Sequence, residues 1–195
     1  MVIYNKDNIK VSTIEENDKE KVLKYFSENT FNCDYESGAL RPSNYEFLHI
    51  MDEIIAGNDE ENILVLKKDD EVIGYEAMHA EYDRIVIGHI AVDKNERKKG
   101  YGELLTHLAI LIAENEDRDV SLFCEHRNKY FGKYEFETSD NIHYLYRRKG
   151  IKTEGIPTLF VSVDEYRIRA EKKREEHLDK FKKTMEMMKK LDLHL

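Results

Sequence analysis

The chain has 195 residues and a mass of 23.1 kDa, with 41% apolar and 36% charged side chains and a net charge of −9 at pH 7. This size suits one compact domain with an appendage, and no apolar run approaches the ~20 residues of a membrane-spanning helix. Two cysteines, Cys33 and Cys124, exclude a disulfide scaffold and favour a reducing cytoplasm. The first residues do not resemble a secretion signal, and no cysteine–histidine cluster has metal-ligand spacing, so we expect no membrane and no metal.

The charge is unevenly distributed along the chain. Residues 1–80 hold 18 acidic and 8 basic side chains, a net charge of −10, whereas residues 81–195 hold 22 and 23. An acidic surface repels phosphate backbones and attracts cations. We therefore expect no nucleic-acid partner.

The spacing of apolar residues predicts the elements in chain order. They are a strand at 8–14, helices at 17–29 and 43–56, strands at 62–66, 71–82 and 85–92, a helix from 102, a strand at 119–124, a short helix at 128–133 and a strand at 142–147. Hairpins followed by a βαβ unit predict an α+β fold (an α/β sandwich). Its mixed, mostly antiparallel sheet should carry helices on both faces.

Residues 149–195 are expected to form a C-terminal extension beyond this domain. A linker is followed by a possible strand at 159–163 and then by a long charged helix from Asp164. Leu178, Phe181, Met185 and Met188 keep a seven-residue alternation on that helix. This stripe either packs on its own domain or forms a homodimer contact through the C-terminal helix.

Residues 85–105 carry the clearest features of a ligand-binding site. A strand rich in β-branched residues leads through a charged loop into an amphipathic helix, and Gly100 and Gly102 stand at the start of that helix. Free amides and the positive end of the helix dipole meet Arg97, Lys98 and Lys99 there. This combination predicts a cradle for a phosphate group.

The spacing Arg97-x-x-Gly100-x-Gly102 after a hydrophobic strand resembles the pyrophosphate loop of the GCN5-related N-acetyltransferases (the GNAT superfamily). Residues 130–136, Tyr-Phe-Gly-Lys-Tyr-Glu-Phe, are similar to the second cofactor segment of that family. The resemblance implies a GNAT-like fold with a splayed central βαβ unit over residues 1–148. It also implies acetyl-CoA as the cosubstrate of an N-acetyltransferase.

The resemblance assigns residues to the cofactor. Backbone groups of Ile90, Ala91 and Val92 would pair with the pantetheine arm and donate to the developing oxyanion. The remaining predicted cofactor-binding residues are Arg97, Lys98, Lys99, Gly100, Tyr101, Gly102 and Phe131.

The catalytic acid and base are less directly implied. The family's acidic tyrosine aligns with Phe131, so either the adjacent Tyr130 protonates the thiolate or the thiolate leaves unaided. Candidates for the base are His89 and, on the neighbouring strand, Glu76 and His79; a chain of water molecules could also remove the proton. The face of the sheet to which the His89 side chain points depends on whether its strand contains a β-bulge.

The resemblance also implies an acceptor groove between the first two helices and the last hairpin, and the predicted loop between those helices carries Asp34, Tyr35 and Glu36. We therefore expect a cationic small-molecule or peptide amine: a polyamine, an aminoglycoside, an amino acid or a lysine side chain. Transfer would occur by direct attack in a ternary complex. The alternative is a non-catalytic acyl-CoA-binding sensor or interaction domain.

Overall fold

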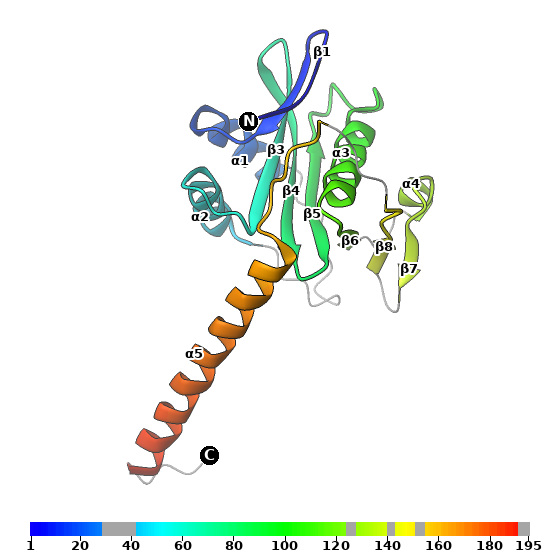
Figure 1. The fold of residues 1–195 in the computed structure, drawn as a ribbon. Coiled ribbons are helices and arrows are strands. Elements are labelled where there is room, and N and C mark those ends of the chain that lie inside the picture. Colours follow the sequence, from blue (N-terminus) through cyan, green and yellow to red (C-terminus); the bar gives the residue numbers. More distant parts are fainter. Residues whose placement is uncertain (29–41, 124–127, 140–142, 151–154, 191–195) are drawn as a thin grey trace. The chain divides into compact units, whose positions relative to one another are not determined.

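A computed structural model describes residues 1–28, 42–123, 128–139, 143–150 and 155–190. The chain divides into two compact units, Met1–Phe160 and Val161–Leu195. The first unit contains a sheet with helices on both faces, as the sequence predicts, and the described part of the second, up to residue 190, contains one long helix (Figure 1).

Within the described residues, eight strands form one sheet in the order β1-β2-β3-β4-β5-β6-β8-β7. Their bounds are β1 (Val2–Lys6), β2 (Ile9–Thr13), β3 (Glu61–Lys68), β4 (Glu71–Glu81), β5 (Arg84–Val92), β6 (Asp119–Phe123), β7 (Glu137–Ser139) and β8 (His143–Tyr146). The pair β5–β6 is parallel and the other pairs are antiparallel. The sequence did not predict β1 or β7.

The helices are α1 (Lys19–Glu28), α2 (Asn44–Ile55), α3 (Tyr101–Asn115), α4 (Asn128–Gly132) and α5 (Val163–Lys190), with a 3₁₀ turn η1 (Glu16–Asp18) before α1. Side-chain caps fix where the first two begin. Ser43 and Glu46 form a capping box at the start of α2, and Glu15 and Asp18 form another at the start of η1, which leads into α1.

The sheet separates two apolar layers. On one face Val22 and Phe26 of α1 and Met51 of α2 pack against Val65 and Tyr75 of the sheet. The ladder pairs place Leu64, Glu76 and Ile90 side by side on the opposite face, which α3 covers (Figure 1). Each strand thus contributes alternate side chains to the two layers.

The segment after β8 belongs to the first compact unit up to Phe160. Asn115 Nδ2 donates to the Ile156 carbonyl, and the amides of Leu159 and Phe160 donate to Glu116 Oε1. These amides bond to a side chain, and no strand forms over 159–163.

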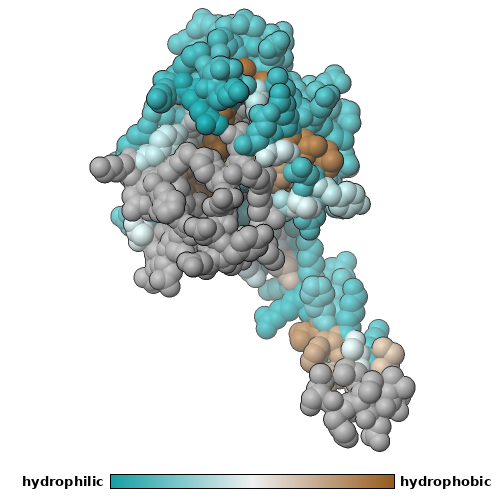
Figure 2. Space-filling view, turned by 180° about the vertical axis from the view of Figure 1, so that it is seen from behind, coloured by the Kyte–Doolittle hydropathy of each residue, from teal (hydrophilic) through white to brown (hydrophobic). Residues whose placement is uncertain are grey.

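Helix α5 begins with Ser162 as its cap, since Ser162 Oγ accepts from the Glu165 amide at 3.2 Å. All its residues from Glu171 to Thr184 are exposed. On the face that Figure 2 shows, the described surface is mostly hydrophilic, and apolar side chains gather toward the C-terminal end of α5. Among the helices that the structure describes, none combines the length and apolar character that crossing a bilayer requires.

Candidate active site

Strand β5 changes partners partway along its length. Residues Arg84–Ile87 pair with Asp119–Leu122 of β6, whereas β4 follows β5 to Val92. Among the described residues, no strand pairs with 88–92 on the β6 side, so β5 and β6 diverge beyond Ile87. The backbone of this part of β5 can therefore accept an extended ligand as an additional strand.

A β-bulge at Gly88 accompanies the divergence. Ile87 lies opposite Met78 and His89 lies opposite Ala77, so Gly88 has no residue opposite it on β4. One extra residue reverses the alternation of side chains along a strand. Ile90 therefore shares a face with Glu76, and His89 projects to the other face, toward α1 and α2.

The loop between β5 and α3 is held by local hydrogen bonds. Asp93 Oδ1 accepts from the Asn95 amide at 2.8 Å, and Arg97 Nε donates to the Val92 carbonyl at 3.0 Å. Gly100, the N-cap of α3, has φ +89° and offers no side-chain cap to the first amides of the helix. The helix N-terminus thus presents bare amides, as an anion-binding site requires.

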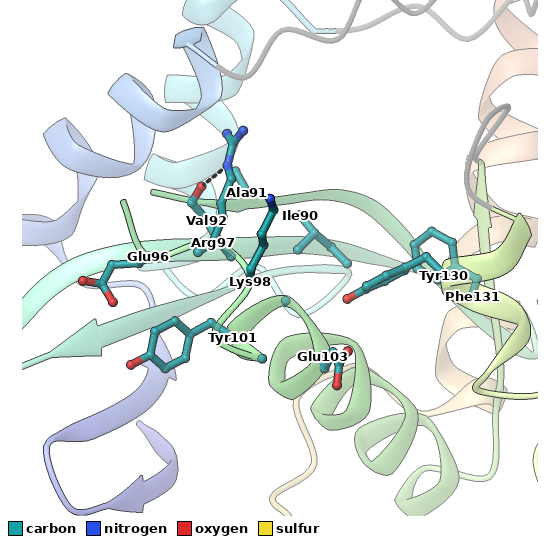
Figure 3. Close-up of a pocket in the computed structure, with 12 residues that line it drawn as sticks. Ile90, Ala91, Val92, Glu96, Arg97, Lys98, Tyr101, Glu103, Tyr130 and Phe131 are labelled. Atoms are coloured by element: carbon teal, nitrogen blue, oxygen red, sulfur yellow. Dashed lines mark hydrogen bonds between the residues drawn. The ribbon is translucent and has the colours of Figure 1, made fainter. Parts of the chain in front are cut away.

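A cavity of about 310 Å³ opens where β5 diverges and α3 begins (Figure 3). It is lined by Ile90, Ala91, Val92, Glu96, Arg97, Lys98, Gly100, Tyr101, Gly102, Glu103, Tyr130 and Phe131. The structure therefore brings together all of the predicted cofactor-binding residues except Lys99, and Tyr130 with them.

Helix α4 contributes the far wall of the cavity. Tyr130 and Phe131 reach the cavity at the end opposite Glu96 and Tyr101 (Figure 3). A Cβ atom added to Gly102 would lie 3.1 Å from the Tyr130 hydroxyl oxygen, so this hydroxyl sits directly over the start of α3. Phe131 is buried and packs edge-on against Tyr130, with ring centroids 4.8 Å apart.

Two carboxylates in the cavity wall were not predicted. Glu96 is held by Lys68 at 3.4 Å and by Lys99 at 3.0 Å, and the hydrogen bond from Lys99 lowers the pKa of this carboxyl. Glu103 forms an ion pair with Lys133. Lys68 lies on β3 and Lys133 directly follows α4, so sequence spacing gave no signal for their pairs with Glu96 and Glu103.

Lys98 differs from these paired groups. It lines the cavity, has φ +64°, and forms no ion pair among the residues that the structure describes. Together with Arg97 it supplies positive charge beside the start of α3. Lys99, by contrast, is occupied by Glu96 and does not line the cavity.

The candidate base His89 lies on the face covered by α1 and α2. Its ring stacks with Tyr75, and Nδ1 is 3.2 Å from the Tyr75 hydroxyl oxygen. The Phe26 ring of α1 is 5.2 Å away between centroids. His79 projects from β4 to the same face, opposite Glu61 of β3, and its Nε2 is 3.3 Å from Glu81.

Glu76 is enclosed on the opposite face. Its side chain is fully buried, and neither carboxylate oxygen has a hydrogen-bond partner among the described residues. Burial raises the pKa of this carboxyl to about 8. Glu76 does not line the cavity, so the structure does not bring Tyr130, His89 and Glu76 together.

The predicted acceptor residues Asp34, Tyr35 and Glu36 lie outside the described residues, as does Cys124. In the described part of the chain, no group of three or more His, Cys, Asp or Glu side chains could hold a metal ion.

Comparison with known proteins defines the class. The model of the acetyltransferase (GNAT) family matches residues 25–130, which is more than half of the chain. The chain therefore belongs to the GNAT family and is an acetyltransferase. Among the sequences of curated proteins, none matches it.

Solved structures share the fold at low sequence identity. PaiA N-acetyltransferase from Thermoplasma acidophilum, in complex with coenzyme A, has a TM-score of 0.55 at 15% identity, covering 73% of this chain and 99% of that one. Glucosamine-6-phosphate N-acetyltransferase from Arabidopsis thaliana has a TM-score of 0.54 at 18% identity, and the match covers 69% of this chain and 95% of that one. N-acetylglutamate synthase from Neisseria gonorrhoeae, complexed with coenzyme A and L-arginine, has a TM-score of 0.55 at 19% identity, and the match covers 73% of this chain and 34% of that one.

Proposed function

We propose that this protein transfers an acetyl group from acetyl-CoA to a primary amine of a cationic acceptor, by direct attack in a ternary complex. The observation that carries the proposal is the cavity between the diverging end of β5 and the uncapped start of α3. A reducing, cytoplasmic setting is part of the proposal, because the chain of 195 residues has two cysteines.

The residues of the cavity fit coenzyme A. The bare amides at the start of α3, with Arg97 and Lys98 beside them, suit a pyrophosphate. Gly100 leaves room for phosphate oxygens to approach the backbone, because no atom beyond its chain neighbours lies within 4 Å of the place where its Cβ would stand. The edge of β5 at Ile90, Ala91 and Val92, which pairs with no strand on the β6 side among the described residues, suits the amides of a pantetheine arm. When bound, acetyl-CoA supplies the acetyl group as a thioester.

We assign the proton transfers to two groups. His89 would accept the proton of the amine at Nε2, which requires its ring hydrogen to be on Nδ1 and to be donated to Tyr75 Oη. Tyr130 Oη would donate a proton to the departing thiolate. Glu76 is a weaker choice for the base, because it is enclosed and keeps its proton at neutral pH.

The acidic character of the acceptor side supports a cationic acceptor. Residues 1–80 have a net charge of −10 and include α1, α2 and the loop with Asp34, Tyr35 and Glu36. On the face shared with His89, Glu61 lies opposite His79. A polyamine, an aminoglycoside, an amino acid or a lysine side chain meets this requirement. Neutral amines of equal size should be poor acceptors, and salt should raise KM for cationic ones.

The function is tested by measuring thiol release from acetyl-CoA over a panel of polyamines, aminoglycosides, amino acids and basic peptides. Gly100→Asp should abolish turnover and binding, because it places a negative charge and a Cβ in the cradle. Gly155→Asp is the matched control, since Gly155 has a similar φ of +83° with equally open space around it. Equal activity of the two variants would contradict the proposed site.

A sensor is the second candidate function, and Phe131 is the observation that favours it. A phenylalanine cannot donate the proton that the family's tyrosine supplies, and Phe131 is buried in the cavity wall. Calorimetry distinguishes the two functions. Binding of acetyl-CoA that Gly100→Asp removes, without turnover of any amine, would favour the sensor.

We also propose a homodimer through α5, on the basis of its exposed apolar stripe. Leu178 is 49% and Phe181 62% exposed, and Met185 follows four residues later on the same side of the helix. Phe181→Lys should convert a dimer to a monomer in sedimentation experiments. Met187→Lys is the control, because Met187 is 58% exposed but lies off the stripe.

A further inference from the structure

A buried link joins α1 to the loop that precedes α3. Tyr25 of α1 is 3% exposed, and its hydroxyl oxygen is 3.0 Å from Asp93 Oδ2 and 3.0 Å from the Val72 carbonyl oxygen. Asp93 is the first residue after β5. The two residues are 68 positions apart in the sequence, so the contact is made only by the fold.

Asp93 controls the path of the loop. While Oδ2 faces Tyr25, Oδ1 accepts from the Asn95 amide at 2.8 Å. The Asp93 backbone completes the turn, because its amide donates to the Ile73 carbonyl and its carbonyl accepts from the Glu96 amide. A carboxylate fixed at both oxygens sets the direction in which the chain leaves the sheet. That direction sets the position of Gly100 at the end of the loop, and therefore the position of the start of α3.

Helix α1, which carries Tyr25, is held in place by contacts with α2. Neighbouring Phe26 stacks on Phe47 of α2 with ring centroids 3.9 Å apart, and Lys19 pairs with Asp52 of α2. Burial and the adjacent Asp93 carboxylate both raise the pKa of Tyr25, so its hydroxyl keeps its proton as a donor. The hydrogen bond from the Asn95 amide is the largest of the causes that hold the pKa of Asp93 below its usual range, and the Tyr25 hydroxyl adds to it.

We propose that Tyr25 is a positioning residue for coenzyme A: through Asp93 it holds the pyrophosphate loop in its binding shape and ties that loop to the helix layer on the acceptor side. The inference rests on the proposed function, because it takes coenzyme A as the ligand of the cavity. Tyr25 touches no ligand in this scheme. It acts through the carboxylate of Asp93.

Tyr25→Phe tests the link, because it keeps the buried ring and removes only the hydroxyl. The Kd of coenzyme A, measured by calorimetry, should rise about five- to tenfold, within the range that loss of one ordinary hydrogen bond gives. In turnover assays KM for acetyl-CoA should rise similarly while kcat changes little, since a ground-state contact is lost.

Tyr146→Phe is the matched control. Tyr146 is also buried and donates to a carboxylate, Glu114 Oε1, at 2.6 Å. Glu114 lies near the far end of α3, roughly 20 Å along the helix from Gly100. Tyr146→Phe should therefore lower thermal stability without changing the Kd of coenzyme A.

A double-mutant cycle with Asp93→Asn completes the experiment. If Tyr25→Phe folds poorly, Asp93→Asn alone tests the same link, because it removes the carboxylate that Tyr25 contacts and should also raise the Kd of coenzyme A. The two changes together should weaken binding no more than the stronger single change. Additive losses, or equal Kd values for Tyr25→Phe and Tyr146→Phe, would overturn the link. If the wild-type protein does not bind coenzyme A, the proposed function is wrong, and the role of Tyr25 in coenzyme A binding is wrong as well. This result differs from one in which the wild type binds coenzyme A but Tyr25→Phe leaves the Kd unchanged.

Discussion

The buried carboxyl of Glu76 should make the stability of this protein depend on pH. Glu76 lies on β4 between Leu64 and Ile90, with no hydrogen-bond partner among the described residues. Its pKa is raised from 4.5 to about 8, and burial is the cause. Because the folded protein holds this proton more tightly than the unfolded chain, Glu76 favours folding below pH 4.5, and this contribution is lost as pH rises toward 8.

The size of the effect follows from linkage. Between the two pKa values the folded state binds one more proton, so the free energy of unfolding falls by about 1.4 kcal/mol per pH unit. Between pH 5.5 and 7.0 the loss should be about 2 kcal/mol. Glu76→Gln keeps the size and the polarity of the side chain but cannot titrate, so it removes this slope.

Urea denaturation of the wild type and of Glu76→Gln at pH 5.5 and 7.0 measures the difference directly. The stability of the wild type relative to the variant should fall by about 2 kcal/mol over this interval. Glu61→Gln is the control, because Glu61 is only half-buried and its raised pKa has the same main cause, burial. Parallel curves for the wild type and Glu76→Gln would show that Glu76 is not enclosed as described.

Three further substitutions test the local geometry. Glu135→Gly should stabilise the protein by about 1 kcal/mol in thermal unfolding, because Glu135 has φ +65°, a left-handed conformation that glycine adopts without strain; a loss of stability would contradict this. Gly102→Ala should raise KM for acetyl-CoA several-fold by displacing the Tyr130 hydroxyl, although alanine favours the helix by about 1 kcal/mol; no change in KM would mean that the hydroxyl does not need its place. Ser43→Ala should cost about 1 kcal/mol in urea denaturation by removing the bond from the Glu46 amide, and a neutral result would show that α2 does not depend on its cap.

Short-range patterns account for what could be predicted from the sequence. The capping box at Ser43 and the apolar spacing of α3 are complete within a few residues, and both elements form where expected. Strand β1 was missed because it lies at the edge of the sheet and its exposure pattern does not alternate. Strand β7 has three residues, which is too short for a period to show.

The same division holds within the site. The pattern from Arg97 to Gly102 is local, and the cavity contains five of its six residues. The link from Tyr25 to Asp93 and the pair of Glu103 with Lys133 join distant positions. No spacing along the chain could have indicated these contacts, because they arise from the packing of helices against the sheet.

The bulge at Gly88 shows most clearly why side-chain roles could not be assigned from the sequence. An uninterrupted strand would place His89 on the same face as Ile87, beneath α3, and would turn Ile90 toward α1 and α2. The extra residue reverses both positions, so that Ile90 lines the cavity and His89 faces α1 and α2. The bulge is defined by the pairing of β5 with β4, and glycine at 88 permits it without requiring it. A single unpaired residue therefore decides whether the histidine can act as the base of the proposed reaction.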